Sequence, residues 1–218
     1  MAVAGMPLAL RMTVIRHPDG SLILHSPVEI DDDLAADISA LGPVSLLLAP
    51  NRFHHLFLLG AGRRWPGAQT WVAPGLARKR PDLLFDGVLG DEAPPELAPA
   101  LETVLFAGAP VASEVLCLHR SSRTLIVADL VFNIHRSESL LSRLYLRANG
   151  AWKRVAQTAV IKLATRDRAA ARSSLERVFA WDFDRLIMAH GDVVDRGAKP
   201  VLARALDWDL GPGVSRWR

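Results

Sequence analysis

The sequence predicts a layered α/β sandwich with mixed β-sheets, and two observations carry this prediction. Short aliphatic runs of strand length, bounded by proline or glycine, come first along the chain. Strands then alternate with segments of helical spacing, an order typical of sheets covered by helices. The 218 residues, 50% of them hydrophobic, suffice for one sizeable core. We therefore expect one domain over residues 1–218, with residues 1–10 as a disordered or strand-leading tail.

The chain is predicted to open with a hairpin and a helix. Residues 12–16 and 21–27 predict two strands, because the turn at residues 17–20 contains a proline and an Asp-Gly pair. Three aspartates, residues 31–33, then precede a helix that ends near Gly42. Negative charge suits a helix N-terminus, so we favour capping over metal binding for these aspartates.

The next element is a buried strand at residues 45–49, an aliphatic run that ends at Pro50. The loop after this strand contains two adjacent histidines, His54 and His55. A sheet holds such a loop still, and loops of this kind often carry site residues. The two imidazoles could bind a metal or transfer a proton, and they could equally be one packed and one solvated side chain.

The remaining elements follow from the same patterns. We expect further strands at residues 70–73, 102–106, 114–119, 124–129 and 181–189. We expect helical segments at residues 74–81, within 130–149, and at 155–163, 166–179 and 199–208. Residues 83–89 predict irregular structure. Neither an internal repeat nor a linker divides the chain.

Composition excludes several classes of function. With 26 basic and 23 acidic residues, the net charge of +3 does not predict nucleic-acid binding. No run approaches the ~18 apolar residues of a membrane helix, so we expect no membrane partner and a cytoplasmic location. Cys117, the single cysteine, excludes an internal disulfide and predicts a small buried hydrophobe. The expected partner is a small molecule, and self-association is left open.

Three predicted strands end on candidate metal ligands: the His54–His55 pair, Asp129, and His190 in His190-Gly191-Asp192. If these ends converge, imidazole and carboxylate groups of the kind that zinc, iron and manganese accept would share a pocket. Each residue has an alternative: Asp129 could cap a following helix, and His190 could belong to a turn. Asp192 is better suited to orienting a ligand or to capping than to binding the ion.

In this order of elements the chain resembles the metallo-β-lactamase superfamily along nearly its whole length. The resemblance is carried by Leu46-Leu47-Leu48 leading to His54-His55, by Ile126-Val127-Ala128-Asp129 and by Ile187-Met188-Ala189-His190-Gly191. It looks closest to a domain-of-unknown-function subfamily, on the stretches at residues 50–55, 74–79 and 122–133. The resemblance implies a four-layer αββα sandwich with two mixed sheets.

The metal motif of that superfamily is incomplete in this chain. The first histidines of its His-x-His-x-Asp-His loop fall near residues 50–53, where no histidine stands, so His55 matches the last position and His54 the aspartate. The middle histidine falls near residues 108–110, where there is again none, and Glu114 a few residues on could substitute. His25, at the end of a hairpin strand, could support the ligands from outside.

The resemblance therefore implies a reduced site. The first hypothesis is a hydrolase with one divalent metal, zinc or iron or manganese, held by His55, Asp129 and His190. In it His54 is a fourth ligand or a base, and His54 and Asp129 are the catalytic candidates. The second hypothesis is a metal-free domain that binds a small molecule or a protein, and the third is an iron-dependent oxidoreductase. A basic loop with Arg52, Arg78, Lys79 and Arg80 could face an anionic substrate or simply be solvated.

Overall fold

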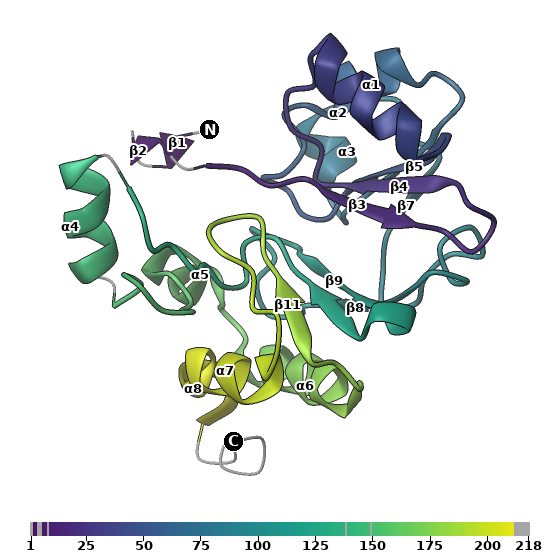
Figure 1. Ribbon diagram of the computed structural model, residues 1–218. Coiled ribbons are helices and arrows are strands. Elements are labelled where there is room, and N and C mark those ends of the chain that lie inside the picture. Colours follow the sequence, from purple (N-terminus) through teal and green to yellow (C-terminus); the bar gives the residue numbers. More distant parts are fainter. Residues whose placement is uncertain (1, 4–5, 8, 138, 149, 212–218) are drawn as a thin grey trace.

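Two β-sheets form the centre of the molecule in the computed structural model, which describes residues 2–3, 6–7, 9–137, 139–148 and 150–211 (Figure 1). The first sheet has the order β3-β4-β5-β6-β7 and consists of β3 (Thr13–Arg16), β4 (Leu22–His25), β5 (Val44–Ala49), β6 (Gln69–Val72) and β7 (Gly87–Val88). Strands β3 and β4 pair antiparallel, and the other neighbours pair parallel. This sheet is therefore mixed.

The second sheet has the order β11-β10-β9-β8 and is also mixed. Its strands are β8 (Leu101–Leu105), β9 (Val115–His119), β10 (Thr124–Ile126) and β11 (Arg185–Ile187). Only β10 and β11 run parallel. A small antiparallel pair, β1 (Ala2–Val3) and β2 (Met6–Pro7), lies where the sequence predicts a disordered or strand-leading tail, and residues 1, 4, 5 and 8 of that stretch lie outside the described part.

Helices cover the outer face of each sheet, as Figure 1 shows. The first sheet is covered by α1 (Asp32–Leu41), α2 (Leu58–Arg64) and α3 (Leu76–Lys79). The second is covered by α6 (Arg168–Ala180) and α7 (Ala198–Ala205), with α8 (Asp207–Leu210) following. The excursion between β10 and α6 holds α4 (Leu140–Ala148) and α5 (Ala159–Ala164). The four layers confirm the predicted αββα sandwich.

Strand β5 shows why the layers stack. Leu46 and Leu48 point between the sheets, where they join a buried cluster with Cys117 of β9. Leu47 and Ala49 point the other way, into the cluster beneath the helices. A strand buried on both faces needs a continuous apolar sequence, and the run from Leu46 to Ala49 supplies it.

Capping places α1 as the sequence predicts. The Asp31 carboxylate accepts a hydrogen bond from the Leu34 amide at 2.8 Å, which confirms capping by the aspartate cluster. Gly42 ends the helix with φ +154°, and a Cβ there would lie 2.8 Å from the Gly20 carbonyl oxygen. The close approach of the β3–β4 turn therefore requires glycine at residue 42.

Several elements differ from the prediction. Strand β11 spans only Arg185–Ile187 of the strand predicted at residues 181–189, and the helix predicted at residues 199–208 is divided into α7 and α8. Helix α2 was not expected, because Gly60 and Gly62 lower its intrinsic propensity; burial of Leu58 and Ala61 against the first sheet stabilises it. The two-residue strand β7 lies in the segment predicted to be irregular. Strand β10 ends at Ile126 rather than at residue 129. None of the described helices has the length and hydropathy that a bilayer span requires.

Candidate metal centre

The centre is built where three chain segments leave the two sheets. His54 lies in the loop after β5, Asp129 three residues after β10, and His190 three residues after β11. Because β10 and β11 run parallel, their carboxyl ends reach the same edge of the second sheet. Among the described residues, His54, Asp129 and His190 form the one group of three or more potential ligands whose ligand atoms lie within 4.8 Å of one another.

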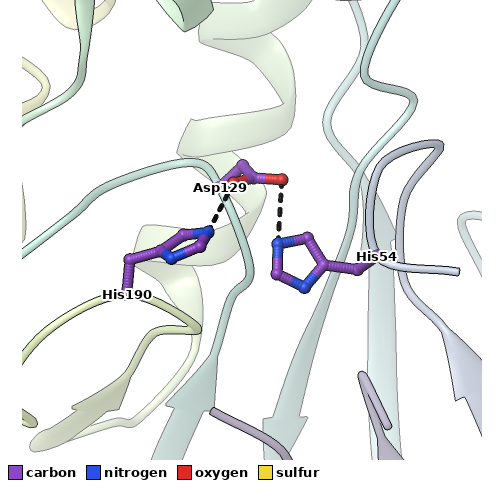
Figure 2. Close-up of side chains that lie close together, drawn as sticks. All are labelled: His54, Asp129 and His190. Atoms are coloured by element: carbon purple, nitrogen blue, oxygen red, sulfur yellow. Dashed lines mark ion pairs between the residues drawn. The ribbon is translucent and has the colours of Figure 1, made fainter. Parts of the chain in front are cut away.

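Each of the two imidazoles faces a different oxygen of the Asp129 carboxylate (Figure 2). His54 Nε2 lies 3.2 Å from Asp129 Oδ2, and His190 Nε2 lies 3.2 Å from Asp129 Oδ1. All three side chains are buried. Two ring nitrogens and a carboxylate thus converge on one small volume.

The outer nitrogen of each imidazole is held by a distant partner. His190 Nδ1 donates to the Ala9 carbonyl oxygen at 2.9 Å, and because a carbonyl only accepts, the proton of the neutral ring sits on Nδ1. His54 Nδ1 shares a 2.6 Å hydrogen bond with Ser26 Oγ. Ser26 adopts φ +57°, a left-handed conformation that is uncommon for a residue other than glycine.

The inner nitrogens are left without good hydrogen bonds. Within the described part of the chain, neither His54 Nε2 nor His190 Nε2 has a hydrogen-bond partner, although both are buried beside Asp129. An unprotonated nitrogen aimed at a carboxylate is unfavourable unless positive charge lies between them. That charge can be a proton on the ring or a metal cation, and a cation satisfies both nitrogens and the carboxylate together.

The electrostatics of Asp129 and His54 are consistent with a positive charge bound between them. Burial opposes ionisation of Asp129, yet the two imidazoles hold the pKa of this carboxyl well below its usual value. Burial likewise disfavours the charged form of His54, but Asp129 and Glu114 raise the pKa of this imidazole above its usual value. The site favours a carboxylate surrounded by cationic partners.

Asn51 ties the parts together, and sequence reasoning did not single it out. Its side chain is fully buried, and Nδ2 donates to Asp129 Oδ2 at 2.7 Å and to Glu114 Oε2 at 3.3 Å. Its Oδ1 accepts from the amides of Phe53 and His54, at 2.9 and 2.8 Å. One amide therefore fixes both the His54 loop and the carboxylate. The available signal was an Asn-x-x-His spacing directly after a strand, which suits an Asx turn.

Glu114, which the sequence offered as a substitute for the missing middle histidine, lies outside the group of converging ligand atoms. Its buried carboxylate accepts hydrogen bonds from the amides of Ala128, Asp129 and Leu130. Burial and the charge of Asp129 raise the pKa of Glu114. Glu114 holds the backbone that carries Asp129.

The structure corrects the expected role of His55. Its Nδ1 lies 3.0 Å from the Arg80 guanidinium, which can only donate, so this nitrogen accepts and has no lone pair left for an ion. Burial, with the charges of Lys79 and Arg80, lowers the pKa of His55 to about 4. A cation is disfavoured in such surroundings, and His54 takes the position that the sequence assigned to His55.

Two other predicted supporting residues lie in different settings. His25 is fully buried at the end of β4, and its Nε2 has no hydrogen-bond partner among the described residues. Burial, with the charge of His54, lowers the pKa of His25 to about 3. Asp192 lies two residues after His190 and lines a cavity; its amide donates to the Asn133 carbonyl at 2.8 Å.

The basic loop is held by its own contacts. Arg52 donates to the Pro110 carbonyl at 3.0 Å, and Lys79 donates to the Arg52 carbonyl at 2.6 Å. Arg80 forms a two-point ion pair with Asp82. Three of the four basic residues, Arg52, Lys79 and Arg80, therefore have hydrogen-bond partners within the protein itself.

No family model and no curated protein matches the sequence. The structure is similar to a metallo-β-lactamase from Pontibacter korlensis, with a TM-score of 0.64 and 13% identity over 97% of this chain and 92% of the other. It is similar to the DIM-1 metallo-β-lactamase exposed to ceftazidime, with a TM-score of 0.57 and 14% identity over 96% of this chain and 86% of the other.

A third similar structure is TTHA1623 in a di-iron-bound form, with a TM-score of 0.57. Its identity is 14%, over 91% of this chain and 94% of the other. At such identities the likeness concerns the fold, and what the site does must be argued from the site itself.

Proposed function

We propose that this chain, which has the metallo-β-lactamase fold, is a metal-dependent hydrolase that holds one divalent ion with His54, Asp129 and His190. The observation that carries the proposal is the pair of buried Nε2 atoms facing one carboxylate. Three protein ligands are the number that catalytic zinc sites use, and they leave a coordination position open. The donor set of two imidazoles and a carboxylate also suits iron or manganese.

A divalent ion bound there would polarise a carbonyl or phosphoryl oxygen and lower the pKa of a bound water. The residues of the chain have separate tasks. Ser26 and Ala9 fix the ring orientations of His54 and His190, so that both Nε2 atoms point inward. Asn51 donates to Oδ2 of Asp129 and so fixes the orientation of this carboxylate toward the two imidazoles.

One alternative has an observation of its own. The two 3.2 Å contacts are also ion-pair distances, so protonated imidazoles would satisfy Asp129 without a metal. The chain would then be a metal-free domain that binds a small molecule or a protein. A metal assay separates the two functions.

The assay quantifies zinc, iron and manganese in protein purified without chelator. We expect about one ion per chain, retained in His17→Gln and lost in His190→Gln and His190→Ala. Adding the metal at about 100 times its dissociation constant should stabilise the wild type by about 2.7 kcal/mol, measured by chemical unfolding. A chain that binds none of these ions and gains no stability from them is the metal-free domain.

The reaction itself is tested on esters, thioesters, lactams and phosphodiesters. Hydrolysis of one of these classes should disappear with chelator, return with the metal, and be lost in the His190 variants. Activity that is unchanged by complete removal of the metal contradicts the proposal.

A further inference from the structure

A cavity of about 480 Å³ lies beside His190. It is lined by residues 9–11, by residues 134–137, 139 and 146, and by residues 189, 191 and 192. Its volume lies in the range of about 300–1,000 Å³ that small-molecule sites occupy. Ala189 and Gly191 line the cavity and are the neighbours of His190 in the chain. A molecule bound in the cavity would therefore contact residues directly next to a candidate metal ligand.

Contacts with Asn133 hold the chain on both sides of Gly191, which lines the cavity. Asn133 donates its amide to the His190 carbonyl at 3.0 Å and accepts from the Asp192 amide at 2.8 Å. Gly191 adopts φ +96°, and a Cβ there would lie 2.1 Å from the Asn133 carbonyl oxygen. The chain therefore passes too close to Asn133 for any other residue at position 191.

The charged side chains of the cavity favour an anion. Arg11, His135 and Arg136 line the cavity, and Asp192 is the one acidic residue among the described lining residues. Arg11 is already anchored: its amide donates to the Ala189 carbonyl and its Nη1 to the Met188 carbonyl, both at 2.9 Å. An anchored guanidinium loses little freedom on binding, and its remaining N–H groups match a carboxylate or phosphate.

We propose that this cavity binds the anionic group of a small substrate, a carboxylate or a phosphate, through Arg11 and Arg136. The link to hydrolysis rests on the proposed function, because the cavity adjoins the His190 end of the candidate metal centre. The N-terminal segment thereby has two tasks: Ala9 orients His190, and Arg11 binds the substrate.

The test measures anion binding to the full chain after its metal is removed with chelator, so that no ion contributes to affinity. The probes are butyrate, butyl phosphate and butyramide, which share a chain length and differ in the head group. Titration is followed by backbone amide NMR. We expect one or both anions to bind about tenfold more tightly than butyramide, with the largest shifts at Gly191, Asp192 and Ser139.

Variants locate the binding groups. Arg11→Met and Arg136→Met should each weaken binding of the preferred anion about tenfold, and Arg204→Met, on the exposed part of α7, should leave it unchanged. Because Arg11 also holds Met188, the exposed Arg136 gives a variant that spares this contact. Three results would overturn the proposal. They are butyramide binding as tightly as the anions, chemical-shift changes centred on Arg52 and Lys79, and an anion affinity that is unchanged in both Arg11→Met and Arg136→Met.

The two proposals fail separately. Anion binding in a protein that never binds metal rejects the hydrolase and keeps the cavity site. Metal-dependent hydrolysis in a protein whose cavity ignores anions rejects the cavity site alone.

Discussion

At the residue scale, neighbouring histidines have opposite surroundings. His54 faces a carboxylate, which raises its pKa, and His55 faces Lys79 and Arg80, which together with burial lower its pKa to about 4. Both side chains are buried, and the spacing of two residues in a loop does not encode which of them faces Asp129. Their different partners do, because a cation site needs negative charge nearby.

This contrast gives a matched pair of variants. His54→Asn should lower metal affinity by about tenfold to a hundredfold. His55→Asn should leave the affinity within a few-fold of the wild type. Affinity is measured by competition with a chromophoric chelator. The reverse order of effects would return the ligand role to His55.

His25 should make the folded state sensitive to acid. Its pKa of about 3 in the folded protein lies below the ordinary 6.5, so below pH 6.5 the unfolded chain binds a proton that the folded chain does not. Stability therefore falls as the pH drops from 6.5 toward 3, by about 2 kcal/mol at pH 5.

Urea unfolding at pH 7.5 and pH 5, in chelator, checks this expectation. His25→Leu should lose about 2 kcal/mol less stability than the wild type between the two pH values. Identical pH dependence in the two proteins would show that His25 does not remain neutral when folded.

At the scale of elements, Asp129 lies in a loop whose backbone amides are bound by a side chain, Glu114, and not by the backbone of a neighbouring strand. Strand β10 ends at Ile126, and the amides of residues 128–130 donate to Glu114, which directly precedes β9. Asp129 is thereby free of the sheet and can face both imidazoles. A longer strand would have fixed its side chain to one face of the sheet.

Glu114→Gln tests this support. The substitution turns an amide NH₂ toward backbone donors, so we expect a loss of about 2–3 kcal/mol in unfolding free energy and weaker metal binding. The matched control is Glu102→Gln on β8, whose ion pair with Arg120 is more exposed and should contribute about 1 kcal/mol or less. Equal losses in the two variants would contradict the supporting role.

At the scale of the whole molecule, the candidate centre joins the two sheets. His54 follows a strand of the first sheet, and Asp129 and His190 follow strands of the second. The cluster between the sheets, which includes Leu48, sets the separation of these parts. A metal bound by all three residues would therefore link the two halves of the sandwich.

Substitutions of two adjacent leucines distinguish an effect on stability from an effect on the geometry of the site. Leu47→Ala, beneath the helices, and Leu48→Ala, between the sheets, each remove a fully buried side chain and should each cost about 2–5 kcal/mol. We expect only Leu48→Ala to weaken metal affinity in the folded protein as well. If both variants bind metal equally, the inter-sheet layer does not position the ligands.

The sequence alone determined most of the framework. Aliphatic runs bounded by glycine or proline predicted β4 and β5. Asp31 and Gly42 predicted the limits of α1, and the apolar neighbours of Cys117 predicted its burial. Burial indeed raises the pKa of this thiol to about 12. These are local properties, since strand period, capping and hydrophobicity are set by a few adjacent residues.

Only the tertiary structure decided which side chains meet. The hydrogen bonds that orient the centre join residues separated by 28, 78 and 181 positions: Ser26 to His54, Asn51 to Asp129, and Ala9 to His190. The same holds for α2, which is stabilised by burial against the first sheet despite its two glycines. Side-chain direction in a loop follows from such long-range contacts, and the period of a sequence does not contain them.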